Sequence, residues 1–197
     1  METRVFSRHL IMQLVCFTEE PSAKIMLEII LPKLIPNIET RVINFEGKQD
    51  LEKNIGNKLR LWKMPDTVFL VTRDQDSGDC QVIKEGLLQK VISSGKENVS
   101  LIRIACHELE SFYLGDLLAV ETGMNIANLS KKQNKKKLRT PDTIVGAKEE
   151  LQKIAKTYQP VSGSRNISEY LKLDGSNKSI SFNFLISGIR KLCIIKP

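Results

Sequence analysis

Two aspartates and a glutamate follow apolar, strand-like segments of this sequence. Asp74 and Asp76 come just after residues 67–72 (TVFLVT), and Glu19 follows the apolar run at residues 9–17. If the backbone stays extended beyond the strand, residues two apart point to one face, so the two aspartates would lie together. Neighbouring carboxylates repel each other unless a cation lies between them, and Mg²⁺ prefers oxygen ligands. We therefore predict that Glu19, Asp74 and Asp76 bind Mg²⁺, or Mn²⁺ in its place.

These carboxylates also have a simpler interpretation as solvated loop residues. A D-x-D pair alone is common, but this one follows a buried strand and accompanies a second strand that ends in an acid. Glu19 could be a metal ligand or the general base that activates a nucleophile. Glu108, after a fourth strand, is a further candidate catalytic residue. Glu110 could instead stabilise a helix N-terminus, and His107 could be structural or a substrate contact.

Strand-like and helix-like segments alternate along the first two thirds of the chain. The strand-like segments are residues 9–17, 40–45, 67–72 and 98–106. The helix-like segments are residues 22–34, 50–62, 81–93 and 107–122. This alternation predicts an α/β fold with about four parallel strands flanked by helices. Ligands of such sheets bind at the carboxyl ends of the strands, where the acidic residues lie.

The last third of the chain has a different pattern. Helices are expected at residues 147–158, around 167–171 and at 179–192, with Gly163 and Ser164 separating the first two. We divide the chain into an α/β core at residues 1–124, a basic loop or arm at 125–145, and a helical C-terminal extension at 146–197 that packs on the core.

The net charge of +7 is concentrated in one segment, residues 131–139 (KKQNKKKLR), and the rest of the chain is nearly neutral. Such a run can attract the phosphates of DNA or RNA, or it can be a solvated loop without a partner. The candidate nucleic-acid-binding residues are Lys131, Lys132, Lys135, Lys136, Lys137 and Arg139. Lys24, Arg73 and Arg103 could also bind phosphate, although surface salt bridges are the simpler role for each.

Several classes of protein do not fit the sequence. The four cysteines form no C-x-x-C pair, which argues against a zinc site and a disulfide framework. No apolar run reaches the ~18 residues of a membrane span. The N-terminal residues lack the cleavage site of a signal peptide, so we expect a cytoplasmic protein without a membrane partner. A P-loop, a G-x-G-x-x-G motif and a nucleophile elbow are absent, so a small-molecule enzyme is disfavoured.

Three segments resemble the Toprim motifs. TEEPSAK (residues 18–24) resembles the first motif, and RDQDSGDC (73–80) resembles the D-x-D motif. CHELESFYLGDL (106–117) is similar to the third signature of a prokaryotic Toprim-related family catalogued as a domain of unknown function. SRNISEYL (164–171) and NKSISFNFLISGI (177–189) are similar to the tail of that family, so the resemblance covers nearly the whole chain.

The resemblance implies a Toprim-like fold and phosphodiester chemistry. Toprim domains of topoisomerases, primases and OLD-type nucleases use a Glu and a D-x-D pair to hold Mg²⁺. This implies Glu19 as catalytic acid/base, with Asp74 and Asp76 as metal ligands. Because no strand-passage machinery fits in this chain, a nuclease is the better expectation. Relatives of this kind often act in phage defence beside an AAA or ABC-type ATPase. The alternative is a non-catalytic Toprim-like module that binds nucleic acid or a partner ATPase.

Overall fold

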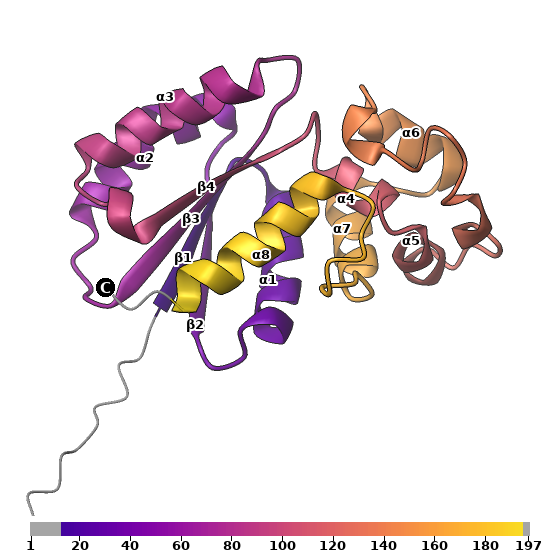
Figure 1. Ribbon diagram of the computed structural model, residues 1–197, viewed down its shortest axis with the longest axis horizontal. Coiled ribbons are helices and arrows are strands. Elements are labelled where there is room, and N and C mark those ends of the chain that lie inside the picture. Colours follow the sequence, from indigo (N-terminus) through magenta and orange to yellow (C-terminus); the bar gives the residue numbers. More distant parts are fainter. Residues whose placement is uncertain (1–12, 195–197) are drawn as a thin grey trace, which may run out of the picture.

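Four parallel strands form the centre of the molecule, in the order β2-β1-β3-β4 (Figure 1). The computed structural model describes residues 13–194. The strands are β1 (Gln13–Thr18), β2 (Glu39–Asn44), β3 (Thr67–Asp74) and β4 (Ser100–Ala105). The predicted class, an α/β fold with four parallel strands flanked by helices, is confirmed and is consistent with a Toprim-like fold. Residues 9–12 of the first predicted strand lie outside the described residues.

Helices cover both faces of the sheet, because strand side chains alternate between two cores. One face packs on α1 (Pro21–Leu34) and α8 (Ile180–Ile194), and the other on α2 (Lys48–Leu61) and α3 (Cys80–Ser93) (Figure 1). Strand side chains of the α1 and α8 face include Leu14, Cys16, Val68 and Leu70. Those of the opposite face include Val15, Phe17, Phe69 and Val71. β1 and β3 are therefore buried on both faces.

The predicted single helix at residues 107–122 is wrong. The structure has two short helices, α4 (Glu110–Leu114) and α5 (Leu117–Gly123). At the break, a Cβ on Gly115 would lie 1.9 Å from the side-chain oxygen of Asn177, so this position has no room for a side chain. Asp116 then caps α5 by accepting a hydrogen bond from the backbone N–H of Ala119. The hydrophobic period continues across this break and therefore did not reveal it.

The helices after the basic segment also differ from the prediction. They are α6 (Ala147–Ile154), which ends before the predicted residue 158, and α7 (Pro160–Ser168). Gly163, predicted to separate two helices, lies inside α7, where a Cβ would lie 2.2 Å from the Tyr158 ring. The glycine there permits close packing of a helix against an aromatic ring, which local turn signals do not distinguish from a break.

Helix α8 lies close to its predicted position at residues 179–192. Asp142 caps its first turn, because its carboxylate accepts hydrogen bonds from the Ser181 N–H at 2.8 Å and the Ser179 hydroxyl at 2.6 Å. Ile180 and Phe184, apolar side chains four residues apart on this helix, are 63% and 60% exposed. The buried face is formed by Phe182, Leu185, Ile186 and Ile189. This stripe has the same helical spacing, and the position of the sheet selects it.

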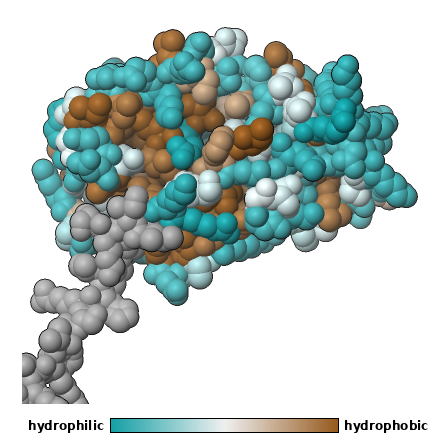
Figure 2. Space-filling view, viewed as in Figure 1, coloured by the Kyte–Doolittle hydropathy of each residue, from teal (hydrophilic) through white to brown (hydrophobic). Residues whose placement is uncertain are grey.

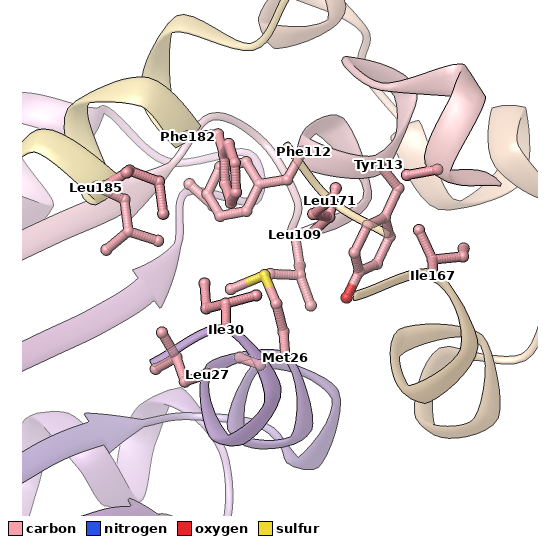
Figure 3. Close-up of a cluster of buried hydrophobic side chains, with 14 of the residues drawn as sticks. Met26, Leu27, Ile30, Leu109, Phe112, Tyr113, Ile167, Leu171, Phe182 and Leu185 are labelled. Atoms are coloured by element: carbon pink, nitrogen blue, oxygen red, sulfur yellow. The ribbon is translucent and has the colours of Figure 1, made fainter. Parts of the chain in front are cut away.

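One cluster of buried side chains joins helices α4 to α7 to the sheet and its flanking helices (Figure 3). It contains Met26, Leu27 and Ile30 of α1 together with Leu109, Phe112, Tyr113, Ile167, Leu171, Phe182 and Leu185. The Phe112 and Phe182 rings pack with centroids 5.2 Å apart. Helices α4 to α8 therefore share a core with α1.

The basic segment is a folded loop. It begins with a 3-10 turn, Ser130–Lys132, and its Leu138 side chain is buried. Gln133 holds it in place by donating to the carbonyl oxygens of Leu114 and Leu138, at 3.0 and 2.9 Å. Other 3-10 turns are Glu97–Val99 and Pro141–Thr143. The lysine side chains are exposed, and Lys137 also pairs with Glu150 of α6.

Strand β4 is an edge strand, and apolar side chains gather beside it on the face seen in Figure 2. A groove here is lined by residues of α3, β4 and α8, including Ile102, Ile104 and Phe184.

Among the helices of residues 13–194, none combines the length and the hydrophobicity that a membrane span requires.

Replacing Asp116 tests how the start of α5 is joined to the segment that follows α7. Asp116 is 5% exposed, and its two oxygens accept hydrogen bonds from the Ala119 and Lys172 backbone N–H groups. Asp116→Ala leaves two donors unpaired and should lower the free energy of unfolding by about 2–4 kcal/mol in chemical denaturation. Asp174→Ala, which removes an exposed carboxylate that also accepts a backbone N–H, is the matched control and should change it far less. Equal losses in the two variants would contradict this role.

Candidate functional site

Acidic residues gather at the carboxyl ends of β1, β3 and β4. Because β1 pairs with β3 and β3 with β4, all in parallel, the segments that follow them start at one edge of the sheet. We call the five carboxylates there the acidic edge: Glu19, Glu20, Asp74, Asp76 and Glu108. The charges of neighbouring carboxylates raise the pKa values of Glu19, Glu20 and Asp74, so each of these three side chains lies near other acids of this edge.

The two aspartates of the D-x-D pair point in different directions. β3 ends at Asp74, and Asp76 has a left-handed backbone with φ of 53°, so the chain does not stay extended between them. Asp74 is buried and accepts a hydrogen bond from the Leu109 N–H at 3.0 Å. Asp76 is partly exposed and lies 2.8 Å from the Lys48 ammonium. The expectation that both carboxylates share one face, which required an extended backbone, is therefore wrong.

The Glu19 carboxylate lies near both aspartates. It is 9% exposed, and its Oε2 accepts no hydrogen bond from any described residue. Burial raises the pKa of Glu19 to about 7; the charge of Asp76 adds to this, and Arg73 opposes it. A carboxyl group with this pKa can both accept and donate a proton near neutral pH, as a general acid or base must.

Burial also raises the pKa of Asp74 well above its usual range, and the charges of Glu20 and Glu19 act in the same direction. A cavity of about 20 Å³ lies beside Glu19 and Asp74, with mostly apolar walls that include Met26, Leu109 and Phe112. These walls exclude most of the water that would otherwise stabilise two charges. Protonation of one carboxyl, or a bound cation, relieves the repulsion.

Arg73 lies among the acids. Its side chain is 8% exposed, and its guanidinium forms a salt bridge to Glu52 of α2. Its Nε lies 3.5 Å from Glu19 Oε2, and its Nη2 lies 3.9 Å from Asp76 Oδ2. Of the three cations that the sequence offered as phosphate ligands, Arg73 contacts the acidic edge. Lys24 pairs with Glu28, and Arg103 donates to the Phe184 carbonyl oxygen.

Glu20 is a site residue that the sequence analysis did not identify. Its carboxylate accepts a hydrogen bond from the Ser22 hydroxyl. Burial raises the pKa of Glu20, and the charges of Asp76 and Glu108 raise it further. Two successive glutamates after β1 were the available signal. Side-chain alternation would turn only one of them inward, but the chain leaves the strand at this point.

The other acidic candidates have structural partners. Glu108 accepts a hydrogen bond at 2.8 Å from the N–H of Lys148 in the first turn of α6. Glu110 is 4% exposed and accepts a hydrogen bond at 2.8 Å from the Tyr158 hydroxyl. His107 has φ of 58°, and its Nδ1 lies 3.3 Å from the Asp76 carbonyl oxygen. These contacts fix the loops that carry the acidic edge.

The basic segment is connected to the acidic edge through α6. Lys137 forms a salt bridge at 2.6 Å with Glu150 of this helix, and Lys148 of the same helix contacts Glu108. Lys131, Lys132, Lys135, Lys136 and Arg139 are exposed. The positive segment and Glu108 thus contact the same short helix.

The acidic edge fits a Mg²⁺ ion in its chemistry but does not form a closed cage. All the donors are carboxylate oxygens, and Glu19 Oε2 is buried without a hydrogen-bond partner among the described residues. Mg²⁺ often needs only one or two carboxylates, with water and substrate phosphate completing its shell. Over residues 13–194, however, no three His, Cys, Asp or Glu side chains are grouped so that they could hold a metal ion. Glu19 and Asp76, which both lie beside Arg73, are the candidate donors, whereas Asp74 is directed toward the Leu109 N–H.

Comparison with family models, with curated proteins and with solved structures gave no match. Membership of the Toprim-related family therefore stays a prediction from the motifs.

The pKa of Glu110 gives a test by pH. Burial raises it to about 7, from 4.5 in the unfolded chain. The protonated form is favoured in the folded state, so this contribution to stability is complete below pH 4.5 and is lost as pH rises through 7. Glu110→Gln keeps an oxygen acceptor for Tyr158 and should be more stable than the wild type at pH 8, by about 1–2 kcal/mol, but not at pH 5.

Urea denaturation at both pH values measures this difference. Glu28→Gln, which makes the same change at a solvent-exposed site on α1, is the control. Its difference in unfolding free energy from the wild type should be the same at pH 5 and pH 8. A constant offset between Glu110→Gln and the wild type at both pH values would contradict the expected titration.

Proposed function

We propose that this protein is a Mg²⁺-dependent nuclease that hydrolyses phosphodiester bonds of DNA or RNA. The observation that carries the proposal is Glu19, a buried carboxylate with an oxygen that no described residue hydrogen-bonds. It lies at the ligand-binding edge of a parallel sheet, beside further carboxylates. A buried anion in such a place requires a proton or a cation as partner, and Arg73, 3.5 Å away, does not form a hydrogen bond to this oxygen.

Each carboxylate has a separate role in this proposal. Glu19 and Asp76 would hold the ion, and Mn²⁺ could replace Mg²⁺ because it accepts the same oxygen ligands. When bound, the ion supplies charge for the scissile phosphate and lowers the pKa of an attacking water. If Asp76 alone holds the ion, Glu19 would instead act as the general base for the attacking water, as its pKa of about 7 permits. Asp74 anchors the loop at Leu109 by accepting a hydrogen bond from its N–H.

The basic segment would bind the nucleic-acid backbone. The acidic edge alone repels phosphates, so attraction has to come from another part of the surface. Lys131, Lys132, Lys135, Lys136 and Arg139 are exposed, and Lys137 of the same segment pairs with Glu150 of α6, the helix whose first turn contacts Glu108. Lysines that contact phosphates fix the position of the substrate without reading its sequence, and their binding weakens as salt increases.

The motif resemblance supports the choice of reaction. It covers nearly the whole chain and assigns Glu19 and the D-x-D pair to phosphodiester chemistry. It also suggests an AAA or ABC-type ATPase, encoded nearby, as a partner, and a role in phage defence. We include the partner in the proposal because the chain itself contains no P-loop.

Isosteric replacement of the carboxylates tests the proposal. Glu19→Gln and Asp76→Asn keep side-chain size but remove the charge, and each should reduce Mg²⁺-dependent cleavage at least about 100-fold. Cleavage of labelled single- and double-stranded DNA and RNA is measured for the purified protein, alone and with its ATPase partner. Glu28→Gln, an exposed glutamate on α1, is the matched control and should cleave at the wild-type rate.

A second measurement separates a nuclease from a non-catalytic module. A ligand of the native state raises its melting temperature, so millimolar Mg²⁺ or Mn²⁺ should stabilise the wild type more than Glu19→Gln. Equal cleavage by Glu19→Gln and the wild type would contradict the assignment of Glu19. If neither cation shifts the melting temperature and no substrate is cleaved, the protein is a binding module.

A further inference from the structure

Arg73 brings a buried positive charge into the acidic edge. It precedes Asp74 on β3, so the alternation of strand side chains turns it to the opposite face of the sheet. There its guanidinium faces Glu52 of α2, Glu19 after β1, and Asp76 in the following loop. Carboxylates from three separate segments therefore surround one cation.

Lys48 adds a second positive charge, at the outer side of this cluster. It is the first residue of α2, and its ammonium lies 2.8 Å from Asp76 Oδ2. The same oxygen lies 3.9 Å from Arg73 Nη2. Asp76 therefore already contacts two cations of the protein itself.

The contact between Arg73 and Glu19 is loose. Arg73 Nε and Glu19 Oε2 are 3.5 Å apart, and neither atom has a hydrogen bond within the described part of the chain. Buried polar atoms are normally hydrogen-bonded, and an unmade bond costs free energy. The attraction here is Coulombic, without the paired hydrogen bonds that hold a forked Arg–carboxylate contact together. An ion that binds Glu19 Oε2 therefore has no hydrogen bond to break at this atom.

We propose that Arg73 and Lys48 are built-in counter-ions, which hold the acidic edge together until a divalent cation displaces them from Glu19 and Asp76. This rests on the cation site of the proposed function and describes how occupancy of that site is regulated. Without positive charge between them, Glu19 and Asp76 would repel each other. With Arg73 and Lys48 in place, the metal-free fold is stable, but an incoming cation has to compete for the same oxygens.

Arg73→Met removes the buried charge and keeps a long side chain in its place. Because the competing charge is gone, this variant should bind Mn²⁺ at least about tenfold more tightly than the wild type in titration calorimetry. It should also melt at a lower temperature in EDTA, and Mn²⁺ should narrow that difference. Arg60→Met, an exposed position on α2, makes the same change in net charge and should match the wild type in both measurements.

An affinity of Arg73→Met for Mn²⁺ equal to or weaker than that of the wild type would overturn the proposal. Lys48→Met gives a second route if Arg73→Met does not fold, because Lys48 lies at the surface and pairs with Asp76. Its affinity for Mn²⁺ should rise about threefold, less than for a buried charge. An unchanged affinity in this variant would likewise count against the counter-ions.

Cleavage assays on the same wild-type sample distinguish this proposal from the nuclease assignment. Tighter Mn²⁺ binding by Arg73→Met, with no cleavage by the wild type, would support the counter-ions and contradict the nuclease. Cleavage by the wild type, with unchanged Mn²⁺ affinity in Arg73→Met, would support the nuclease and contradict the counter-ions. No detectable Mn²⁺ binding by the wild type or Arg73→Met would overturn both.

Discussion

Repulsion among carboxylates at the end of a parallel sheet is the constraint on which this structure depends. β1 and β3 are buried on both faces, so the acids that follow them start at the border of a dry core. Water cannot fully solvate Glu19 and Asp74 there, and burial raises the pKa of both. Three effects stabilise this arrangement: the positive charge of Arg73, the hydrogen bond from the Leu109 N–H to Asp74, and partial protonation of the carboxyl groups at neutral pH.

The loops around the acidic edge follow from the same constraint. Asp76 and His107 both adopt left-handed backbone conformations, which are uncommon outside glycine, and the Asp76 N–H donates to the His107 carbonyl oxygen at 2.7 Å. This pairing extends the β3–β4 contact beyond the strands and turns Asp76 away from Asp74. Backbone strain of this kind persists where the surrounding structure holds it in place, and it is concentrated at functional sites.

Contacts with α6 and with Tyr158 hold in place the loop after β4 that carries Glu108 and Glu110. Glu108 binds the first turn of α6, and Glu110 binds Tyr158 between α6 and α7. Met26 of α1 and Phe112 of α4 lie in the core cluster that joins these helices to the sheet (Figure 3). The acids that the sequence assigned to one cluster thus divide into two layers. The outer layer surrounds Arg73, and the inner layer holds the helices in position.

The sequence by itself determined the alternation of strands and helices, because apolar residues at periods of 2 and about 3.6 are local properties of the chain. It also placed Glu19, Asp74 and Asp76 at one edge, since parallel strands that alternate with helices end on the same side. Only the tertiary structure decided the direction of each carboxylate, the break at Gly115, the course of α7 through Gly163 and the position of Arg73. Each of these depends on a contact between residues distant in sequence, such as Gly115 with Asn177 or Arg73 with Glu19, and such contacts leave no local pattern.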